Sequence, residues 1–165
     1  MNAEYICDLV KGLFLLDCYI CKRKNNKGAD IVVSSSNLID YLLKQGIVPG
    51  NKVKNQVCVP GWIKQNLGYR VACLRGLMDT DGGVYIHQYK IAGKSYKYLK
   101  LCFTNCSQPL LDFAHETLKS LNIKAYKTGY HVSIFSAIGV KEYFQTVGSH
   151  NSKHFDRFKS HLERC

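Results

Sequence analysis

Two carboxylates, Asp79 and Asp81, lie two residues apart at the end of an expected helix and are followed at once by Gly82 and Gly83. Peptide dipoles disfavour negative charge at the C-terminus of a helix by roughly 0.3–1 kcal/mol unless a cation lies nearby. The position of the two acids therefore indicates a metal ion, although an Asp-Gly pair by itself is more often an ordinary helix end with a turn. We expect the two glycines to supply the positive φ angles that end the helix and allow a strand to begin.

The helix that positions these acids is expected over Tyr69–Asp79. Small residues recur in it at every fourth position, namely Ala72, Gly76 and Thr80. Side chains four residues apart share one face of a helix, and a glycine inside a helix costs about 1 kcal/mol relative to alanine. We therefore predict that this stripe is a helix–helix interface at which a second helix approaches closely.

The residues Leu74–Gly82 resemble the LAGLIDADG signature of homing endonucleases, with Arg75 and Thr80 in place of its alanines and Met78 in place of its isoleucine. Further segments look like those that flank the motif in two-repeat members: Gly50–Gln56, Pro60–Ile63 and Phe103–Ser107. The resemblance implies an α+β protein with the LAGLIDADG homing-endonuclease fold. In that fold, αββαββα repeats form a saddle of antiparallel strands over the DNA major groove, and two motif helices pack at its centre.

The resemblance also implies a site for Mg²⁺ or another divalent cation such as Mn²⁺. Asp81 would bind the ion directly and the backbone carbonyl of Thr80 would help, because hard oxygen ligands suit it. Asp79 would lie close by as a further catalytic residue that orients the helix end. The ion would activate a water and stabilise the leaving oxygen of a phosphodiester. Lys52 and Lys153 follow the last helix of each repeat and are candidates for stabilising negative charge at the cleavage centre.

The strands expected after the motif, Val84–Ile91 and Tyr96–Thr104, alternate in character. Leu99, Leu101 and Phe103 should point into a core, and the opposite face should meet DNA, whose major groove accepts a two-stranded ribbon. In the first of these strands the resemblance places Tyr85, His87 and Tyr89 on the DNA side. The other residues that we expect to contact bases or phosphates are Lys94, Lys97, Tyr98, Lys100, Thr104, Asn105, Lys22, Arg23, Lys24 and Lys27. For any single one of them a solvated surface position is an equal alternative, and His131 and His154 are interpreted as surface histidines.

The order of elements repeats along the chain. The first third is expected to form helix Tyr5–Leu16, strands Cys18–Arg23 and Ile31–Ser36, and helix Leu38–Gln45. The same order returns in Leu110–Leu121, Ile123–Lys127, His131–Ser136 and Val140–Val147, with turns at Asn25–Gly28 and Thr128–Gly129. This pattern predicts a partial first repeat at 1–48, a linker at 49–66 and a complete repeat at 67–165.

Composition limits the class of protein. A chain of 165 residues that is 46% hydrophobic is long enough to bury a core, and its net charge of +11 should attract polyanions. No apolar stretch is long enough to span a membrane and no signal peptide precedes the first helix, so we expect an intracellular protein, cytoplasmic or organellar. Cys7, Cys58, Cys73 and Cys102 lie in apolar runs and are interpreted as reduced core residues. A zinc site at Cys18 with Cys21 and Cys102 with Cys106 is a less favoured alternative.

Only one motif is visible, whereas the family cuts two strands with two motifs. The sequence leaves open a homodimer, which we favour, a complex with a separately encoded first repeat, or an inactive remnant. The predicted function is an intron-encoded or otherwise mobile site-specific DNA endonuclease. The alternative is a non-catalytic nucleic-acid binder of the same fold, such as an RNA maturase or a transcription regulator. An intein is less favoured, because the chain starts at Met1 and ends at Cys165 without the residues that protein splicing requires.

Overall fold

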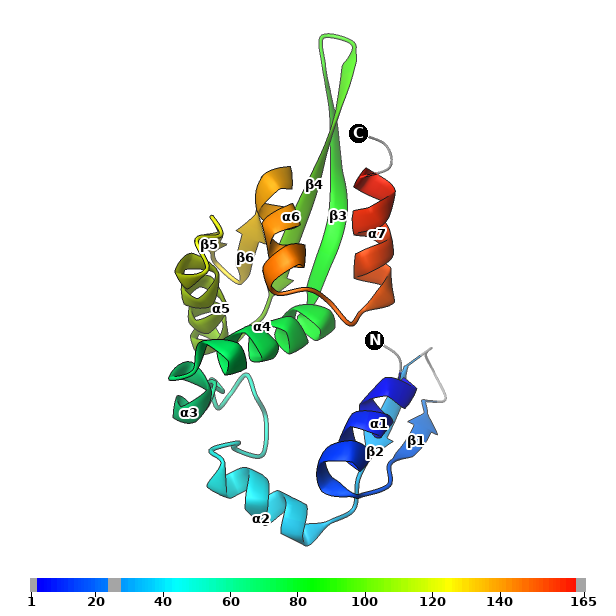
Figure 1. The fold of residues 1–165 in the computed structure, drawn as a ribbon, viewed down its shortest axis with the longest axis vertical. Coiled ribbons are helices and arrows are strands. Elements are labelled where there is room, and N and C mark those ends of the chain that lie inside the picture. The colour runs from blue at the N-terminus through cyan, green and yellow to red at the C-terminus, as the bar shows by residue number, and fades with distance from the viewer. Residues whose placement is uncertain (1–2, 24–27, 163–165) are drawn as a thin grey trace. The chain divides into compact units, whose positions relative to one another are not determined.

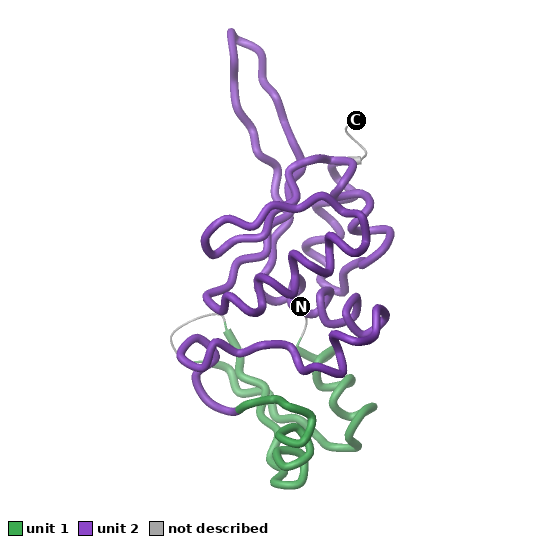
Figure 2. Tube along the Cα trace, turned by 90° about the vertical axis from the view of Figure 1, so that its left-hand side faces the viewer, with its two compact units in different colours: residues 1–48 green, residues 49–165 purple. Residues whose placement is uncertain are grey.

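The computed structural model describes residues 3–23 and 28–162, apart from the side chain of Leu162. The chain forms two compact units, residues 1–48 and residues 49–165 (Figure 2). None of the described helices is both long enough and apolar enough to cross a membrane.

The first unit contains the predicted helix, two strands and helix. These are α1 (Ala3–Phe14), β1 (Tyr19–Lys22), β2 (Ala29–Val32) and α2 (Ser36–Lys44), and the two strands pair antiparallel. The second strand ends earlier than predicted because Ser35 caps α2, its hydroxyl accepting the Leu38 N–H at 3.2 Å. In the turn that we expected at Asn25–Gly28, residues 25–27 lie outside the described part of the chain.

The first unit has no core of its own among its described residues. No side chain in 3–23 or 28–48 is buried, and large apolar residues such as Leu13 and Leu15 are 71% and 80% exposed. Two short helices and a two-stranded ribbon enclose too little volume to exclude water. The interpretation of this unit as a partial repeat remains a prediction.

The second unit contains a complete αββαββα repeat. It runs through α4 (Leu67–Asp81), β3 (Gly82–Ile91), β4 (Lys94–Thr104), α5 (Gln108–Ser120), β5 (Tyr126–Thr128), β6 (His131–Ile134) and α6 (Ala137–Thr146). The predicted α+β fold and the predicted order of elements are confirmed. A short helix, α3 (Gly61–Lys64), precedes the repeat, and α7 (Ser152–Leu162) follows it.

Residues 49–66, which we expected to form a linker, belong to the second unit. The Ser107 hydroxyl donates to the carbonyl of Val57 at 2.6 Å, and the Gln108 N–H donates to the side-chain oxygen of Gln56 at 3.0 Å. Val59 is buried in the core. This segment is therefore fixed against the start of α5, so its side chains are in place to contribute to a site.

The four strands of the second unit form one antiparallel sheet in the order β3-β4-β6-β5. Strand β4 pairs with β3 from Lys94 to Phe103 but with β6 only from Leu101 to Thr104. The outer part of the β3–β4 hairpin is therefore a two-stranded ribbon, and it extends beyond the helices (Figure 1). Such a ribbon is free to enter a groove.

One face of the sheet is covered by helices α4, α5, α6 and α7. Leu99, Leu101 and Phe103 of β4 are at most 1% exposed on this face, as the alternation predicts, and Val132 and Ile134 of β6 join them. Side chains on the opposite face are not covered by these helices. The predicted inward and outward faces of β4 are confirmed.

Helix α7 was not predicted. Asn151 begins it by accepting the Lys153 N–H at 3.2 Å, Phe158 stacks on Phe144 of α6 at 4.1 Å, and Arg157 donates to the carbonyl of Val84 at 2.9 Å. The interpretation of His154 as a surface residue was wrong, since this helix buries it. The spacing of Phe155 and Phe158 after Asn151 was the available signal for a helix.

The cysteines differ from their predicted setting. Every cysteine in the described ranges is a free thiol, and none of them is buried. Cys58 is exposed and Cys7 and Cys102 are only partly buried, so the prediction that these three lie in a core was wrong. Cys73 is also partly buried, but it packs against the core, as predicted. For Cys102 the reason is its register, which places it on the uncovered face of β4.

Candidate active site and nucleic-acid interface

Helix α4 passes directly into strand β3 at Gly82. The Gly82 N–H donates to the carbonyl of Met78, and Gly82 has φ −100° and ψ 173°, so the predicted positive φ angle was wrong. Gly83 is also absent from the described residues with positive φ. Glycine is needed for space at position 82, because a Cβ atom there would lie 2.4 Å from the Met78 carbonyl oxygen. The close turn sets the last helical residue, Asp81, beside the start of the sheet.

The Asp81 carboxylate is one-third exposed and has two hydrogen-bonding partners. Its Oδ2 accepts from Nδ2 of Asn105 at 2.9 Å and lies 3.2 Å from Nζ of Lys52. Both partners bind the same oxygen, so within the described part of the chain Oδ1 accepts no hydrogen bond. Lys52 comes from the segment before α3, and Asn105 directly follows β4. Segments far apart in the sequence therefore hold one partly exposed carboxylate.

Asp79 is in a different environment, because its side chain is only 1% exposed. Its Oδ1 accepts from the Ser149 hydroxyl at 2.5 Å, and its Oδ2 accepts from the His150 N–H at 2.8 Å. The Asp79 carbonyl accepts from Asn151 Nδ2 at 3.0 Å. These donors satisfy a carboxylate that the helix dipole would otherwise disfavour. The burial argues against direct contact with substrate, and the hydrogen bonds give Asp79 a positioning role at the end of α4.

The loop after α6 is held from a second direction by Arg75, which stands where the family motif has alanine. Its Nε donates to the carbonyl of Val147 at 2.5 Å, and its Nη1 lies 3.1 Å from Nε2 of His150. Arg75 and Asp79 are one helical turn apart, and both side chains bind the same loop. Sequence analysis missed this loop, since its polar residues Ser149 and Asn151 carry no motif of their own.

The predicted helix–helix interface is an exposed stripe on α4. Ala72, Gly76 and Thr80 are exposed, and a Cβ atom on Gly76 would meet nothing within 4 Å. The Thr80 hydroxyl is turned back onto its own helix, where it donates to the carbonyls of Gly76 and Leu77. The stripe itself therefore carries only short side chains, and the space above Gly76 is open. A role in helix packing remains a prediction.

The two lysine candidates differ in their positions. Lys52 pairs with Asp81, as described above. Lys153 is exposed in the first turn of α7, and no interaction between its side chain and Asp81 is present among the described residues. Only Lys52 is therefore in contact with the candidate metal ligand.

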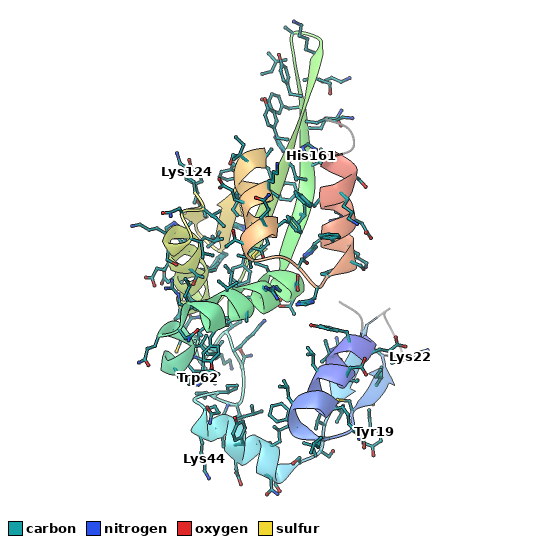
Figure 3. All side chains as sticks on the ribbon, in the orientation of Figure 1. Tyr19, Lys22, Lys44, Trp62, Lys124 and His161 are labelled. Atoms are coloured by element: carbon teal, nitrogen blue, oxygen red, sulfur yellow. The ribbon has the colours of Figure 1, made fainter. Side chains whose placement is uncertain are left out.

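The uncovered face of the sheet brings together most of the predicted DNA-contacting residues. The strand register pairs Tyr85 with Lys100 and His87 with Tyr98, and these four share one face. On the same face Tyr89 stacks between Tyr96 and Tyr98, with ring centroids 5.4 and 5.6 Å apart. The stacked rings stiffen the outer hairpin, where no helix supports it. Figure 3 shows side chains standing out on both sides of this ribbon.

Lysines lie at and near the hairpin tip. Lys94 follows the turn at Ala92 and Gly93, both of which have positive φ, and Lys97 pairs with Gln88 on the opposite face from Tyr98. No Asp or Glu occurs between Gly82 and Leu111. The hairpin is therefore uniformly cationic on both faces.

Thr104 belongs to a small polar cluster at the base of the same face. Its hydroxyl lies 2.9 Å from Nδ1 of His131, which also lies 3.7 Å from the Cys102 thiol. The Ser133 hydroxyl donates to Cys102 at 3.3 Å. His131 is exposed, as predicted, whereas its contact with Thr104 depends on strand pairing that the sequence does not reveal.

Several predicted DNA contacts need correction. Asn105 is only 5% exposed; its amide binds Asp81 and its Oδ1 accepts the Ser107 N–H, so it is a structural partner of Asp81 and does not reach DNA. Arg23 forms a two-pronged ion pair with Asp30, which neutralises its charge, raises its pKa and lowers the pKa of Asp30. Lys22 is exposed at the end of β1, and Lys24 and Lys27 lie outside the described residues.

Comparison with protein families gives one match. Residues 68–148 match the family model of the LAGLIDADG-like domain, and this range extends from the first turn of α4 to the glycine that follows α6. No curated protein matches the chain. Members of the family are typically DNA-binding endonucleases or maturases. Residues 68–148, which form the αββαββα repeat, are therefore a LAGLIDADG-like domain.

Proposed function

We propose that the protein is a divalent-metal-dependent DNA endonuclease in which Asp81 is the metal ligand. The observation that carries the proposal is the state of this carboxylate. It is partly exposed at the end of the motif helix, and Asn105 and Lys52 hold one of its oxygens while the other is open. A carboxylate that served only the fold would be expected to have both oxygens satisfied, as Asp79 does.

The residues at this helix end suit a hard divalent cation. Asp81 Oδ1 is an anionic oxygen to which no described residue donates. The carbonyl of Thr80 lies in the last turn of α4, where carbonyls lack partners within the helix. No cluster of three His, Cys, Asp or Glu side chains that could hold a metal occurs among the described residues. Phosphate oxygens and water would have to complete the coordination, which is usual for Mg²⁺. When bound, the cation would supply a nucleophile at neutral pH and neutralise charge on the scissile phosphate.

The other residues of the site position Asp81 and receive the phosphate. Asn105 fixes the carboxylate from the end of β4. Lys52, which pairs with Asp81 in the free protein, supplies a flexible ammonium that can turn to a phosphate oxygen when DNA arrives. Asp79 and Arg75 hold the loop at 147–151 and thereby the helix end.

Double-stranded DNA is the proposed partner, bound by the β3–β4 hairpin. The ribbon carries lysines and tyrosines without acidic residues, and a two-stranded ribbon fits the major groove. Because lysine–phosphate contacts release counterions, the affinity should fall steeply with salt concentration. An affinity that does not change with salt concentration would argue against phosphate neutralisation by these lysines.

A second motif helix would be supplied by another polypeptide, and we favour a second copy of the same chain. The small-residue stripe on α4 supports close helix packing, and the first unit, in whose described residues no side chain is buried, supports completion by a partner. Sedimentation of the wild type and of Gly76→Leu tests this. Loss of the dimer in the variant supports a homodimer through α4, whereas a wild type that is monomeric at all concentrations favours a separate first-repeat chain.

Cleavage of a library of duplexes with varied sequence tests the function. With Mg²⁺ or Mn²⁺ present, we expect cut products from the wild type and none from Asp81→Asn, whereas Asp112→Asn should cut like the wild type. The wild type and Asp81→Asn should both still retain duplexes on a filter. Cleavage that is equally strong in Asp81→Asn would exclude Asp81 as the metal ligand.

A non-catalytic nucleic-acid binder remains the second candidate, and one observation favours it. The hydrogen bonds of Asp79 account for its presence by a structural role alone. The contacts of Asp81 with Lys52 and Asn105 are consistent with a structural role for Asp81 as well. Under this alternative, wild type and Asp81→Asn bind duplexes equally and neither cuts. RNA added as a competitor would then separate a maturase-like binder from a DNA-binding regulator.

A further inference from the structure

An aromatic hollow lies at the edge of the sheet, apart from the helix end that carries Asp81. Its volume is ≈ 530 Å³, and it is lined by Tyr98 of β4, Tyr126 of β5, Phe135 after β6 and Ile138 of α6, among others. The volume falls in the range of roughly 300–1,000 Å³ that is typical of sites for small ligands. We propose that this hollow receives one unpaired nucleobase of a nucleic acid bound along the sheet; the inference rests on the proposed nucleic-acid binding.

The rings of the hollow are arranged for stacking. Tyr126 and Phe135 lie with their ring centroids 5.4 Å apart and tilted by 36°, and they face the hollow together with Tyr98. Tyr98, Tyr126 and Phe135 are each 40–45% exposed, so part of each ring is accessible to solvent. A planar base has a π-face that stacks on such rings whatever its sequence.

Two lysines add charge at the hollow. Lys124, labelled in Figure 3, places its ammonium 5.6 Å from the ring centre of Tyr126, and Lys100 places its ammonium 5.1 Å from that of Phe135. No Asp or Glu occurs between Glu116 and Glu142 or between Asp81 and Asp112, so neither stretch of chain around the hollow supplies an acid. Aromatic faces beside unneutralised ammonium groups match a base with its phosphate better than an apolar peptide.

The hollow is continuous with the proposed DNA-binding face. Tyr98 lines it and also stacks on Tyr89 in the outer hairpin. Lys100, whose ammonium lies over Phe135, pairs with Tyr85 on the same face of the sheet. A DNA strand bound along the tyrosines of the hairpin would therefore reach the hollow. A base that has left the DNA double helix could then enter the hollow.

Fluorescence anisotropy with labelled DNA tests the proposal. The probes are a fully paired duplex, the same duplex with one extra unpaired nucleotide, and the same bulge without its base. We expect the bulged duplex to bind about tenfold more tightly than the paired one, as stacking of one base allows. The bulge without a base should bind like the paired duplex, because it keeps the phosphate and loses only the ring.

Variants assign the effect to the hollow. Phe135→Ala and Tyr126→Ala should remove the preference for the bulge and leave binding of the paired duplex within about twofold, whereas Tyr130→Ala, an exposed tyrosine outside the hollow, should change neither. Far-UV circular dichroism checks that each variant folds. Equal affinity for bulged and paired duplexes in the wild type overturns the inference and leaves the proposed function standing. Failure of the wild type to bind any duplex overturns both, and a changed sedimentation coefficient in Phe135→Ala identifies the hollow as a protein interface instead.

Discussion

Nδ2 of Asn105 donates a hydrogen bond across 2.9 Å to Oδ2 of Asp81 and so joins the end of β4 to the end of α4. Lys52 approaches the same oxygen at 3.2 Å. Because both partners converge on Oδ2, the direction in which Oδ1 points is fixed by the fold. The orientation of the candidate metal ligand therefore depends on a buried amide that is distant in sequence.

Replacement of Asn105 should lower stability and loosen Asp81. Asn105→Ala removes a buried donor and acceptor, and we expect the free energy of unfolding to fall by about 1–3 kcal/mol. Asn105→Asp should lower the free energy of unfolding further, because two neighbouring carboxylates repel each other at neutral pH. Urea unfolding measures both. Asn37→Ala, at an exposed position of α2, is the control, and equal stabilities of Asn105→Ala and the control would contradict the structural role.

The two glycines of the motif should respond in opposite ways to alanine. Gly82→Ala places a Cβ atom 2.4 Å from the Met78 carbonyl oxygen, so the backbone must shift at a cost of about 1–3 kcal/mol. In Gly76→Ala the added Cβ atom meets open space, so the higher helix propensity of alanine should raise the free energy of unfolding by up to about 1 kcal/mol. This gain is expected as long as no partner covers the stripe on α4. Thermal unfolding at low protein concentration compares them. A destabilising Gly76→Ala under these conditions would mean that the stripe is already packed.

These contrasts show what the sequence predicts and what it leaves open. The periodicity of apolar residues predicted the inward face of β4, because Leu99, Leu101 and Phe103 alternate regularly. The motif predicted a helix ending at the acids. It did not distinguish buried Asp79 from partly exposed Asp81, because their difference arises from Ser149, His150 and Asn105, which tertiary folding brings to the helix end.

Other errors have the same physical origin. Gly82 was expected to need a positive φ, whereas its role is to allow close approach to Met78, which depends on how sharply the chain turns into β3. Asn105 was expected to contact DNA, but the fold buries it and engages its side chain with Asp81 and with the Ser107 N–H. Helix α7 was missed since its polar residues lowered the apolar signal, although Phe155 and Phe158 lie at helical spacing.

Stability should depend on pH through His154. Burial lowers the pKa of this imidazole below its ordinary value of 6.5; Asp79 opposes the shift, and Arg157 adds to it. As the pH falls below that value, the unfolded chain takes up a proton before the folded one does, so this contribution to stability is complete above pH 6.5 and decreases below it. Urea midpoints of wild type and His154→Gln across this range measure the effect. As the pH falls, the urea midpoint of His154→Gln should decrease less than that of the wild type, whereas that of His87→Gln should decrease as much as the wild type's. The same decrease in all three proteins would contradict the assignment to His154.

Tyr143 should tolerate loss of its hydroxyl. The hydroxyl is buried without a hydrogen-bond partner among the described residues, and burial together with the charge of Asp79 raises its pKa. An unsatisfied buried hydroxyl costs roughly 1–3 kcal/mol, so Tyr143→Phe should leave the melting temperature unchanged or raise it. Tyr130→Phe, at an exposed position, is the reference. A clear loss of stability in Tyr143→Phe would indicate a partner, such as a bound water, for this hydroxyl.

Iron-directed cleavage of the polypeptide tests most directly whether Asp81 binds a divalent cation. Fe²⁺ takes the place of Mg²⁺ in the presence of a duplex, and ascorbate with peroxide then generates radicals that cut the chain next to the bound ion. We predict cuts beside Asp81 and Asn105 that excess Mg²⁺ suppresses, that disappear in Asp81→Asn and that persist in Asp112→Asn. Cuts that persist in Asp81→Asn, or a cleavage pattern that avoids the end of α4, would contradict the assignment of Asp81 as the metal ligand.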